Sequence, residues 1–86
     1  MSETPEDRIK RLRMRSMRRG IKEMDILLTR YADAELAGLS AAELDLYDAL
    51  LWENDQDLLI WVTGQQPAPD RYAGMIAHIA RVATPG

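Results

Sequence analysis

The sequence predicts an all-α protein, a compact bundle of about five short helices. No stretch shows the alternating β-branched and aromatic pattern of a strand, and phenylalanine is absent altogether. Apolar residues instead recur every three or four positions in several segments, which is the period of an amphipathic helix. A chain of 86 residues is long enough to bury one core. We therefore expect a single helical domain over residues 1–86, ordered from about 6 to 83, with both termini frayed.

The first predicted helix begins near Pro5. Thr4 supplies a capping hydroxyl, and Pro5 suits the first turn because the N–H that it lacks would have no partner there. Glu6 and Asp7 would lie near the positive end of the helix dipole. Gly20 is expected to end or bend this helix, since glycine costs a helix interior about 1 kcal/mol relative to alanine. Arginines cover most of the helix, and the remaining face carries Ile9, Leu12, Ser16 and Met17.

The second predicted helix has a clear apolar stripe and ends near Gly38, which suits a left-handed C-terminal cap. Its stripe consists of Ile21, Met24, Leu27, Leu28 and Tyr31. Ser40 and Glu43 then predict a capping box: the Ser40 hydroxyl can accept from the Glu43 amide, while the Glu43 side chain accepts from the Ser40 amide. The third helix, which follows this box, would bury Leu44, Tyr47, Leu50 and Leu51.

The fourth predicted helix is short and nearly all apolar, and this composition is typical of a helix at the centre of a bundle. Asn54 or Asp55 caps it and Gly64 stops it. Its apolar residues are Leu58, Leu59, Trp61 and Val62. Pro67 and Pro69 forbid a continuing helix and predict a long turn. The last helix would place Tyr72, Met75, Ile76, Ile79 and Val82 on one face.

Composition excludes several classes of chemistry. The chain has no cysteine, which rules out disulfides, a thiolate nucleophile and a thiolate metal site. His78 is the only histidine, and we interpret it as a partly exposed helix residue rather than a catalytic base. No apolar run approaches the length that is needed to cross a bilayer. The first residues are acidic and polar, unlike a secretory signal or a mitochondrial presequence, so we expect a cytoplasmic protein.

Charge is distributed unevenly along the chain. Residues 1–22 carry eight basic and three acidic side chains, whereas residues 23–86 carry three basic and eleven acidic ones. Such asymmetry indicates that one end faces an anionic partner or that the two halves attract each other. A nucleic-acid-binding or regulatory adaptor that uses residues 8–22 is therefore the alternative function. The acidic remainder, which would repel a polyanion, and the lack of aromatic side chains among the arginines argue against it.

The stretch from Arg18 to Asp25, with the sequence RRGIKEMD, separates the basic segment from the acidic remainder and has two interpretations. In the first, Gly20 makes a turn between helices, Glu23 faces the positive end of the next helix, and the arginines are solvated. In the second, Gly20 lets the backbone of a partner approach, and Arg19 and Glu23 project beside it as a charged pair. The candidate partner-binding residues are Arg18, Arg19, Gly20, Lys22, Glu23 and Asp25.

Other candidate sites have simpler explanations. Asp55 and Asp57 could hold a cation or act as an acid–base pair, but positions at a helix cap and in its first turn explain both. Trp52 and Trp61 could form an aromatic platform. We expect Trp61 to pack in the core and Trp52, beside an acidic turn, to be partly exposed.

The RGxxE pattern within Arg18–Asp25, together with later residues, resembles the small FAD assembly factors of succinate dehydrogenase. This family comprises a bacterial flavinylation factor and its mitochondrial counterpart. The resemblance extends from about Met14 to Val82, nearly the whole domain. The later matching residues are Leu39-Ser40, Leu50-Leu51, Asp55-x-Asp57-Leu58, Trp61 and a turn between Gly64 and Pro67.

The resemblance implies a five-helix fold and a chaperone rather than an enzyme. Family members bind the flavoprotein subunit of succinate dehydrogenase, and in some bacteria that of fumarate reductase. They promote covalent attachment of FAD to a histidine of that subunit, which catalyses the reaction itself. The motif carries over onto Arg19, Gly20 and Glu23, with Asp25 in its usual place. We expect no stably bound cofactor and no catalytic or metal-binding residue.

The same resemblance, with the lack of a presequence, suggests a bacterial, cytoplasmic member. We expect it to be a monomer that neither inserts into the membrane nor binds nucleic acid.

Overall fold

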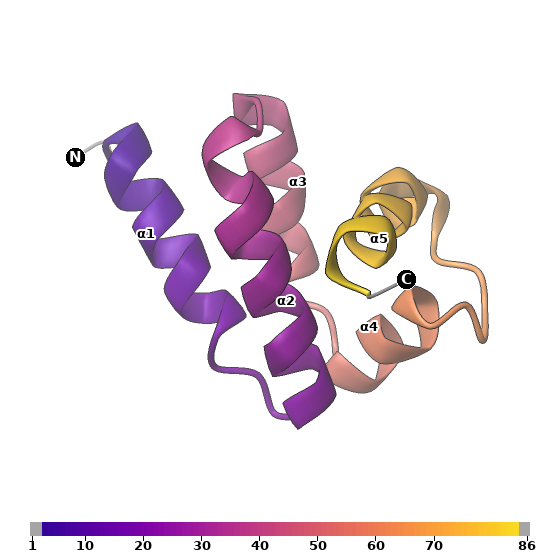
Figure 1. Cartoon of the computed structure of the whole chain (residues 1–86). Helices are drawn as coiled ribbons and strands as arrows, with labels where there is room; N and C mark the ends of the chain where they lie inside the picture. Colours follow the sequence, from indigo (N-terminus) through magenta and orange to yellow (C-terminus); the bar gives the residue numbers. More distant parts are fainter. Residues whose placement is uncertain (1–2, 85–86) are drawn as a thin grey trace.

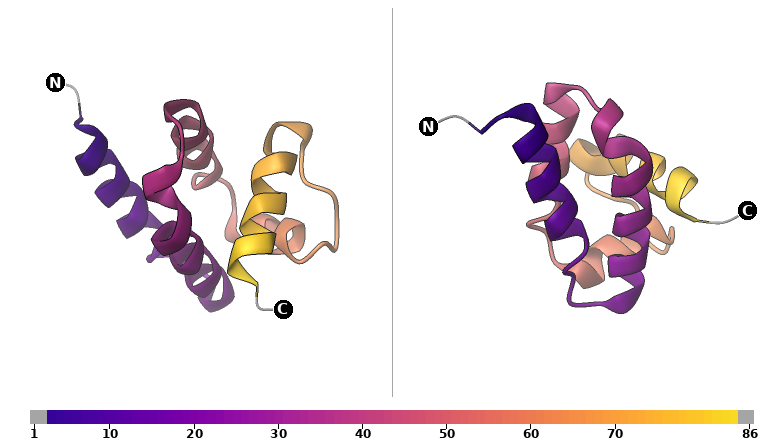
Figure 2. Two further views of the ribbon diagram at one scale, coloured as in Figure 1. Left: turned by 45° about the horizontal axis from the view of Figure 1, so that its top comes forward. Right: turned by 60° about the vertical axis from the view of Figure 1, so that its left-hand side comes forward.

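Helix α2 lies at the centre of the fold, a computed structural model that describes residues 3–84 (Figure 1). It packs against α1 on one side and against α4 and α5 on the other, and the left view of Figure 2 places α1 and α5 on opposite sides of it. The predicted all-α bundle of five helices is confirmed over the described residues. In chain order they form α1 (Pro5–Ser16), α2 (Lys22–Glu35), the 3-10 turn η1 (Leu36–Gly38), α3 (Ala41–Leu50), α4 (Asp55–Val62) and α5 (Asp70–Ala83).

Local sequence signals set most of the helix ends. The Thr4 hydroxyl caps α1, accepting a hydrogen bond of 3.1 Å. The capping box of α3 is complete: the Glu43 amide donates to Ser40 Oγ at 3.1 Å, and the Ser40 amide donates to Glu43 Oε1 at 2.8 Å. The hydrogen bond from the Ser40 amide, helped by the Ser40 hydroxyl, lowers the pKa of the Glu43 carboxyl. Asn54 caps α4, and Gly64 follows that helix with φ of 78°. These four predictions are confirmed.

The core lies where α2 meets the other helices. Its largest fully buried side chains are Tyr31 of α2 and Tyr47 of α3, whose rings are 5.5 Å apart. The other fully buried apolar side chains are Leu12, Met24, Leu28, Leu36, Leu50, Leu58 and Ile79. Among residues 3–84, every buried side-chain nitrogen or oxygen has a hydrogen-bond partner, as a stable interior requires.

Three details of the predicted packing are wrong. Met17 is 47% exposed rather than part of the buried face, because α1 ends at Ser16 and the chain turns away. Gly38 belongs to a 3-10 turn, and it does not adopt the positive φ of a left-handed cap. The fourth helix is peripheral: Leu59 and Trp61 are only partly buried, and Trp61 stacks on Tyr72 with ring centroids 6.2 Å apart.

Candidate docking site

The RGxxE motif lies where α1 passes into α2. Helix α1 ends at Ser16, α2 begins at Lys22, and residues 17–21 form the connection. Gly20 and Glu23 are both exposed, so a partner can reach them. Ile21 precedes α2 and offers no side-chain cap. The first backbone amides of α2 are therefore left to other backbone groups and to solvent.

The Arg19 side chain turns inward and is only 9% exposed. Its Nε donates to Asp55 Oδ1 at 2.7 Å, and its Nη1 donates to the Leu51 carbonyl at 2.9 Å. A longer contact of 3.4 Å joins Nη2 to the Glu53 carbonyl. The expectation that Arg19 projects beside Glu23 is therefore wrong, as is that of a solvated guanidinium. Arg19 instead ties the α1–α2 connection to the segment between α3 and α4.

Gly20 contacts the same carboxylate as Arg19. Its amide donates to Asp55 Oδ2 at 2.7 Å. A Cβ at Gly20 would lie 3.2 Å from that oxygen, closer than ordinary van der Waals contact. Gly64 is the one described residue with a positive φ, so the backbone conformation at Gly20 does not itself require glycine. The space beside Gly20 is thus limited by Asp55 of its own chain.

The exposed charges of the motif point outward. Arg18, Lys22 and Glu23 are exposed, and among residues 3–84 none of their side chains makes an ion pair or a hydrogen bond. Asp25 is half-buried at the edge of a surface hollow of about 310 Å³. The structure thus presents two cations and one anion on a single helix junction, available to a partner of complementary charge.

Arginines of α1 face the acidic side chains of α3. Arg8 pairs with Asp45, and Arg11 and Arg15 both pair with Asp48 at 3.0 and 3.1 Å. Of the two explanations for the uneven charge, attraction between the two halves is therefore realised within the chain. These side chains bridge two helices whose backbones make few close approaches.

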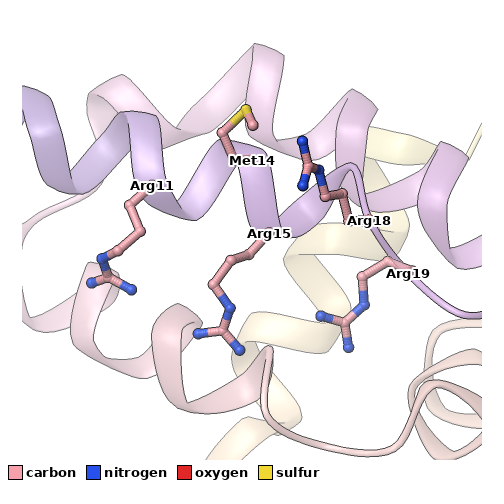
Figure 3. A pocket seen from close by; sticks show the side chains of 5 residues that line it. All are labelled: Arg11, Met14, Arg15, Arg18 and Arg19. Atoms are coloured by element: carbon pink, nitrogen blue, oxygen red, sulfur yellow. The ribbon is translucent and has the colours of Figure 1, made fainter.

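A hollow of about 470 Å³ along α1 is lined by Arg11, Met14, Arg15, Arg18 and Arg19. Figure 3 shows the side chains of Arg11, Arg15 and Arg19 pointing toward α3 and the segment after it, whereas Met14 and Arg18 point the other way. The three inward arginines are held by the chain's own acceptors. Arg18 is left as the arginine of this group that is free to meet another molecule.

Exposed apolar side chains gather around the same junction. Met14, Met17 and Ile26 are exposed, and Met17 and Ile26 line one hollow. Trp52 is 77% exposed, as expected of it, and the Arg15 guanidinium lies 4.2 Å from its ring centroid. Such a stack is a cation–π contact. The apolar stripes predicted from the sequence left out Met14 and Ile26 and assigned them no role, so they were missed as part of this surface.

The other sequence candidates lie elsewhere. His78 is half-buried on α5, as predicted of a partly exposed helix residue, and it bonds to Tyr31 and Glu35. The described residues contain no group of three or more histidine or carboxylate side chains placed to hold a metal ion. None of the described helices is both long and apolar enough to span a membrane.

The fold and this surface define a small helical protein with charged and apolar side chains exposed at one helix junction. The chain belongs to the family of flavinators of succinate dehydrogenase, whose model matches residues 10–83. It is 44% identical over 72 residues to the mitochondrial succinate dehydrogenase assembly factor 2 of Mycosarcoma maydis, covering 84% of this chain and 30% of that protein.

Two more relatives carry the same name. Identity is 45% over 73 residues with the protein of Meyerozyma guilliermondii, covering 81% of this chain and 54% of that protein. Identity with the protein of Schizosaccharomyces pombe is 37% over 70 residues, covering 81% of this chain and 50% of that protein. The chain thus spans between about a third and a half of the length of these relatives.

Proposed function

We propose that this chain is an assembly factor that binds the flavoprotein subunit of succinate dehydrogenase and promotes covalent attachment of FAD to it. Family membership supports the proposal. The observation that carries it is the exposure of Gly20 and Glu23 at the α1–α2 junction; Asp55 contacts Gly20 from one side, and both residues remain accessible. The factor is a chaperone in this proposal. It holds no cofactor stably, and the subunit catalyses its own flavinylation.

The chemistry of the junction suits a folded protein as partner. Arg18 and Lys22 can pair with carboxylates, and Glu23 can accept from amides or arginines of the partner. Met14, Met17 and Ile26 add apolar area beside these charges, and a charged rim around apolar contacts is typical of protein interfaces. Docking would hold the reacting methyl carbon of the flavin near its histidine in a productive geometry, an effect of positioning.

Replacing Glu23 with alanine tests the proposal. In cells with Glu23→Ala as the sole copy of the factor, we expect covalent flavin, read as ultraviolet in-gel fluorescence of the subunit, to be lost. Glu6→Ala is the matched control, since Glu6 is also an exposed glutamate in a first helical turn, at the far end of α1. Helix content by circular dichroism should match that of the wild type in both variants. Normal flavin fluorescence with Glu23→Ala would refute the role of Glu23.

A second variant tests the surface itself. Gly20→Arg places a long side chain on the exposed junction and should abolish co-purification with the flavoprotein subunit. Gly74→Arg is its control, because Gly74 is exposed on α5 with open space where its side chain would start. Co-purification that is equally strong in both variants would exclude the junction as the docking site.

A nucleic-acid-binding role for residues 8–22 is disfavoured by the ion pairs of α1. Five of the arginines in this segment, namely Arg8, Arg11, Arg13, Arg15 and Arg19, pair with carboxylates of the chain's own. An electrophoretic shift with steep salt dependence, lost on replacing Arg11, Arg13 and Arg15, would support that alternative instead.

Four finer expectations belong to the same proposal. We propose that the chain acts as a monomer, that it also serves fumarate reductase, that it stays out of the membrane, and that it works in the bacterial cytoplasm. The relatives are named mitochondrial, so the location stays a prediction. Sedimentation of the purified chain and cell fractionation test the first and the last.

A further inference from the structure

The Asp55 carboxylate holds two consecutive residues of the motif at once. Oδ1 accepts from Arg19 Nε and Oδ2 accepts from the Gly20 amide, both at 2.7 Å. Asp55 is the first residue of α4, yet Asn54 caps that helix. The cap and first-turn explanation of Asp55 is therefore incomplete, because both of its oxygens face the α1–α2 connection.

This arrangement divides the motif by role. The Arg19 guanidinium donates to Asp55 and to two backbone carbonyls, so few of its donors remain for a partner. Arg18, Lys22 and Glu23, on either side, are exposed. Charge-assisted hydrogen bonds of this length are among the stronger contacts that a side chain makes. Without them, residues 17–21 would have few contacts to fix the direction in which the exposed side chains point.

We propose that Asp55 is a positioning residue for the docking site: it fixes the loop of residues 17–21 so that Arg18, Lys22 and Glu23 are presented in the geometry that the partner needs. Arg19 acts with Asp55 inside the protein rather than by touching the partner. The proposal rests on the proposed function for its partner, the flavoprotein subunit. The general reason is that a loop held in its bound conformation loses less conformational entropy on docking.

Asp57 provides a matched control for Asp55. Both are acidic residues in the first turn of α4, but Asp57 is exposed and makes no ion pair within residues 3–84. Asp55→Asn and Asp57→Asn therefore remove the same charge from the same helix end, and only Asp55→Asn changes the contacts to Arg19 and Gly20. Circular dichroism first confirms that both variants keep the helix content of the wild type.

The first measurement needs no partner. Amide hydrogen exchange of Gly20 in the isolated chain should be faster in Asp55→Asn than in the wild type, and unchanged in Asp57→Asn. The amide of Leu28, in the middle of α2, should keep its protection in both variants. Unchanged exchange at Gly20 in Asp55→Asn would overturn the proposed clamp.

The second measurement uses the purified flavoprotein subunit of succinate dehydrogenase. Asp55→Asn and Arg19→Gln should each raise the dissociation constant about tenfold or more. The double variant should bind no more weakly than whichever single variant has the lower affinity. Asp57→Asn should bind like the wild type. If Asp55→Asn binds as tightly as the wild type, the positioning role is overturned while the proposed function stands.

Two remaining outcomes are also decisive. If the wild-type chain does not bind the subunit, the proposed function fails together with the docking role, and the exchange of Gly20 still decides the clamp. If Asp55→Asn loses helix content, Asp55→Glu replaces it, since this variant keeps the charge but lengthens the side chain by one methylene. Asp55→Glu should weaken both the protection of Gly20 and the binding, and wild-type values for both would overturn the inference.

Discussion

The hydroxyl groups of Ser16 and Tyr47 lie 2.6 Å apart, and both side chains are fully buried. Ser16 Oγ donates its proton to the Leu12 carbonyl at 2.8 Å, so the Tyr47 hydroxyl is the donor to Ser16. This pair joins the last turn of α1 to α3 inside an otherwise apolar core. Removing Ser16 would leave the Tyr47 hydroxyl in the interior without its acceptor, whereas removing the Tyr47 hydroxyl would leave Ser16 bonded to Leu12.

We expect Ser16→Ala to lower the free energy of unfolding by about 1–3 kcal/mol, because the Tyr47 hydroxyl then loses its buried acceptor. Tyr47→Phe removes that hydroxyl and leaves Ser16 bonded to the Leu12 carbonyl. The double variant should therefore be more stable than the sum of the two single losses predicts. Urea unfolding followed by circular dichroism measures all three. Strictly additive losses would contradict the proposed coupling.

Stability should fall at alkaline pH. Burial raises the pKa of Tyr47 to about 12 from its ordinary value of 10.0, and the hydrogen bond to Ser16 only partly offsets this. Burial also raises the pKa of Tyr31. Above pH 10 the unfolded chain releases these protons while the folded chain keeps them, so stability is fully present below pH 10 and is lost as the pH rises toward 12.

For Tyr47 alone this loss amounts to about 2–3 kcal/mol. By pH 11 about half of this loss, roughly 1.4 kcal/mol, is expected, and urea unfolding at pH 9, 10 and 11 measures that part. In Tyr47→Phe the decline should be clearly shallower. A variant whose decline equals that of the wild type would show that another group is responsible.

The ring of His78 should have one defined tautomer. Its Nε2 lies 3.0 Å from Glu35 Oε1, and its Nδ1 lies 2.8 Å from the Tyr31 hydroxyl. Because a carboxylate can only accept, Nε2 carries the proton of the neutral ring and Nδ1 accepts from Tyr31. The ¹⁵N chemical shifts of the ring report this directly. A neutral ring protonated at Nδ1 would contradict the hydrogen-bond chain.

Asp48→Asn should weaken the attachment of α1 to α3. Arg11 and Arg15 share this carboxylate. Because two partly exposed ion pairs are lost with it, the substitution should lower the free energy of unfolding by about 1 kcal/mol at low salt. The difference from the wild type should shrink in high salt. Asp33→Asn is the control, since its pair with Arg13 is more exposed. Equal losses in the two variants would refute the shared role of Asp48.

The features that were predictable from the sequence are those encoded within a few residues. The capping box of Ser40 and Glu43, the cap at Thr4 and the turn at Gly64 each depend on neighbours in the chain. The apolar stripe of the second helix likewise follows from its own spacing. The same local evidence located the junction at Gly20, although it left open whether the motif faces a partner or only makes a turn.

What the sequence could not reveal depends on residues far apart. Arg19 turns inward because Asp55, 36 residues later, and two carbonyls of the segment after α3 accept its hydrogen bonds. No spacing rule connects these positions. The peripheral place of α4 was missed for a similar reason: composition alone does not show which helices it packs against, and the longer α2 takes the centre.

The distribution of methionines has a practical consequence. Met14 and Met17 are exposed beside the junction, whereas Met24 and Met75 are buried. Dilute peroxide should convert the first two thioethers to sulfoxides well before the others. A partner bound at the junction would shield Met14 and Met17 from peroxide. Mass spectrometry of the oxidised wild-type protein, with and without the partner, can therefore show whether the partner covers the junction.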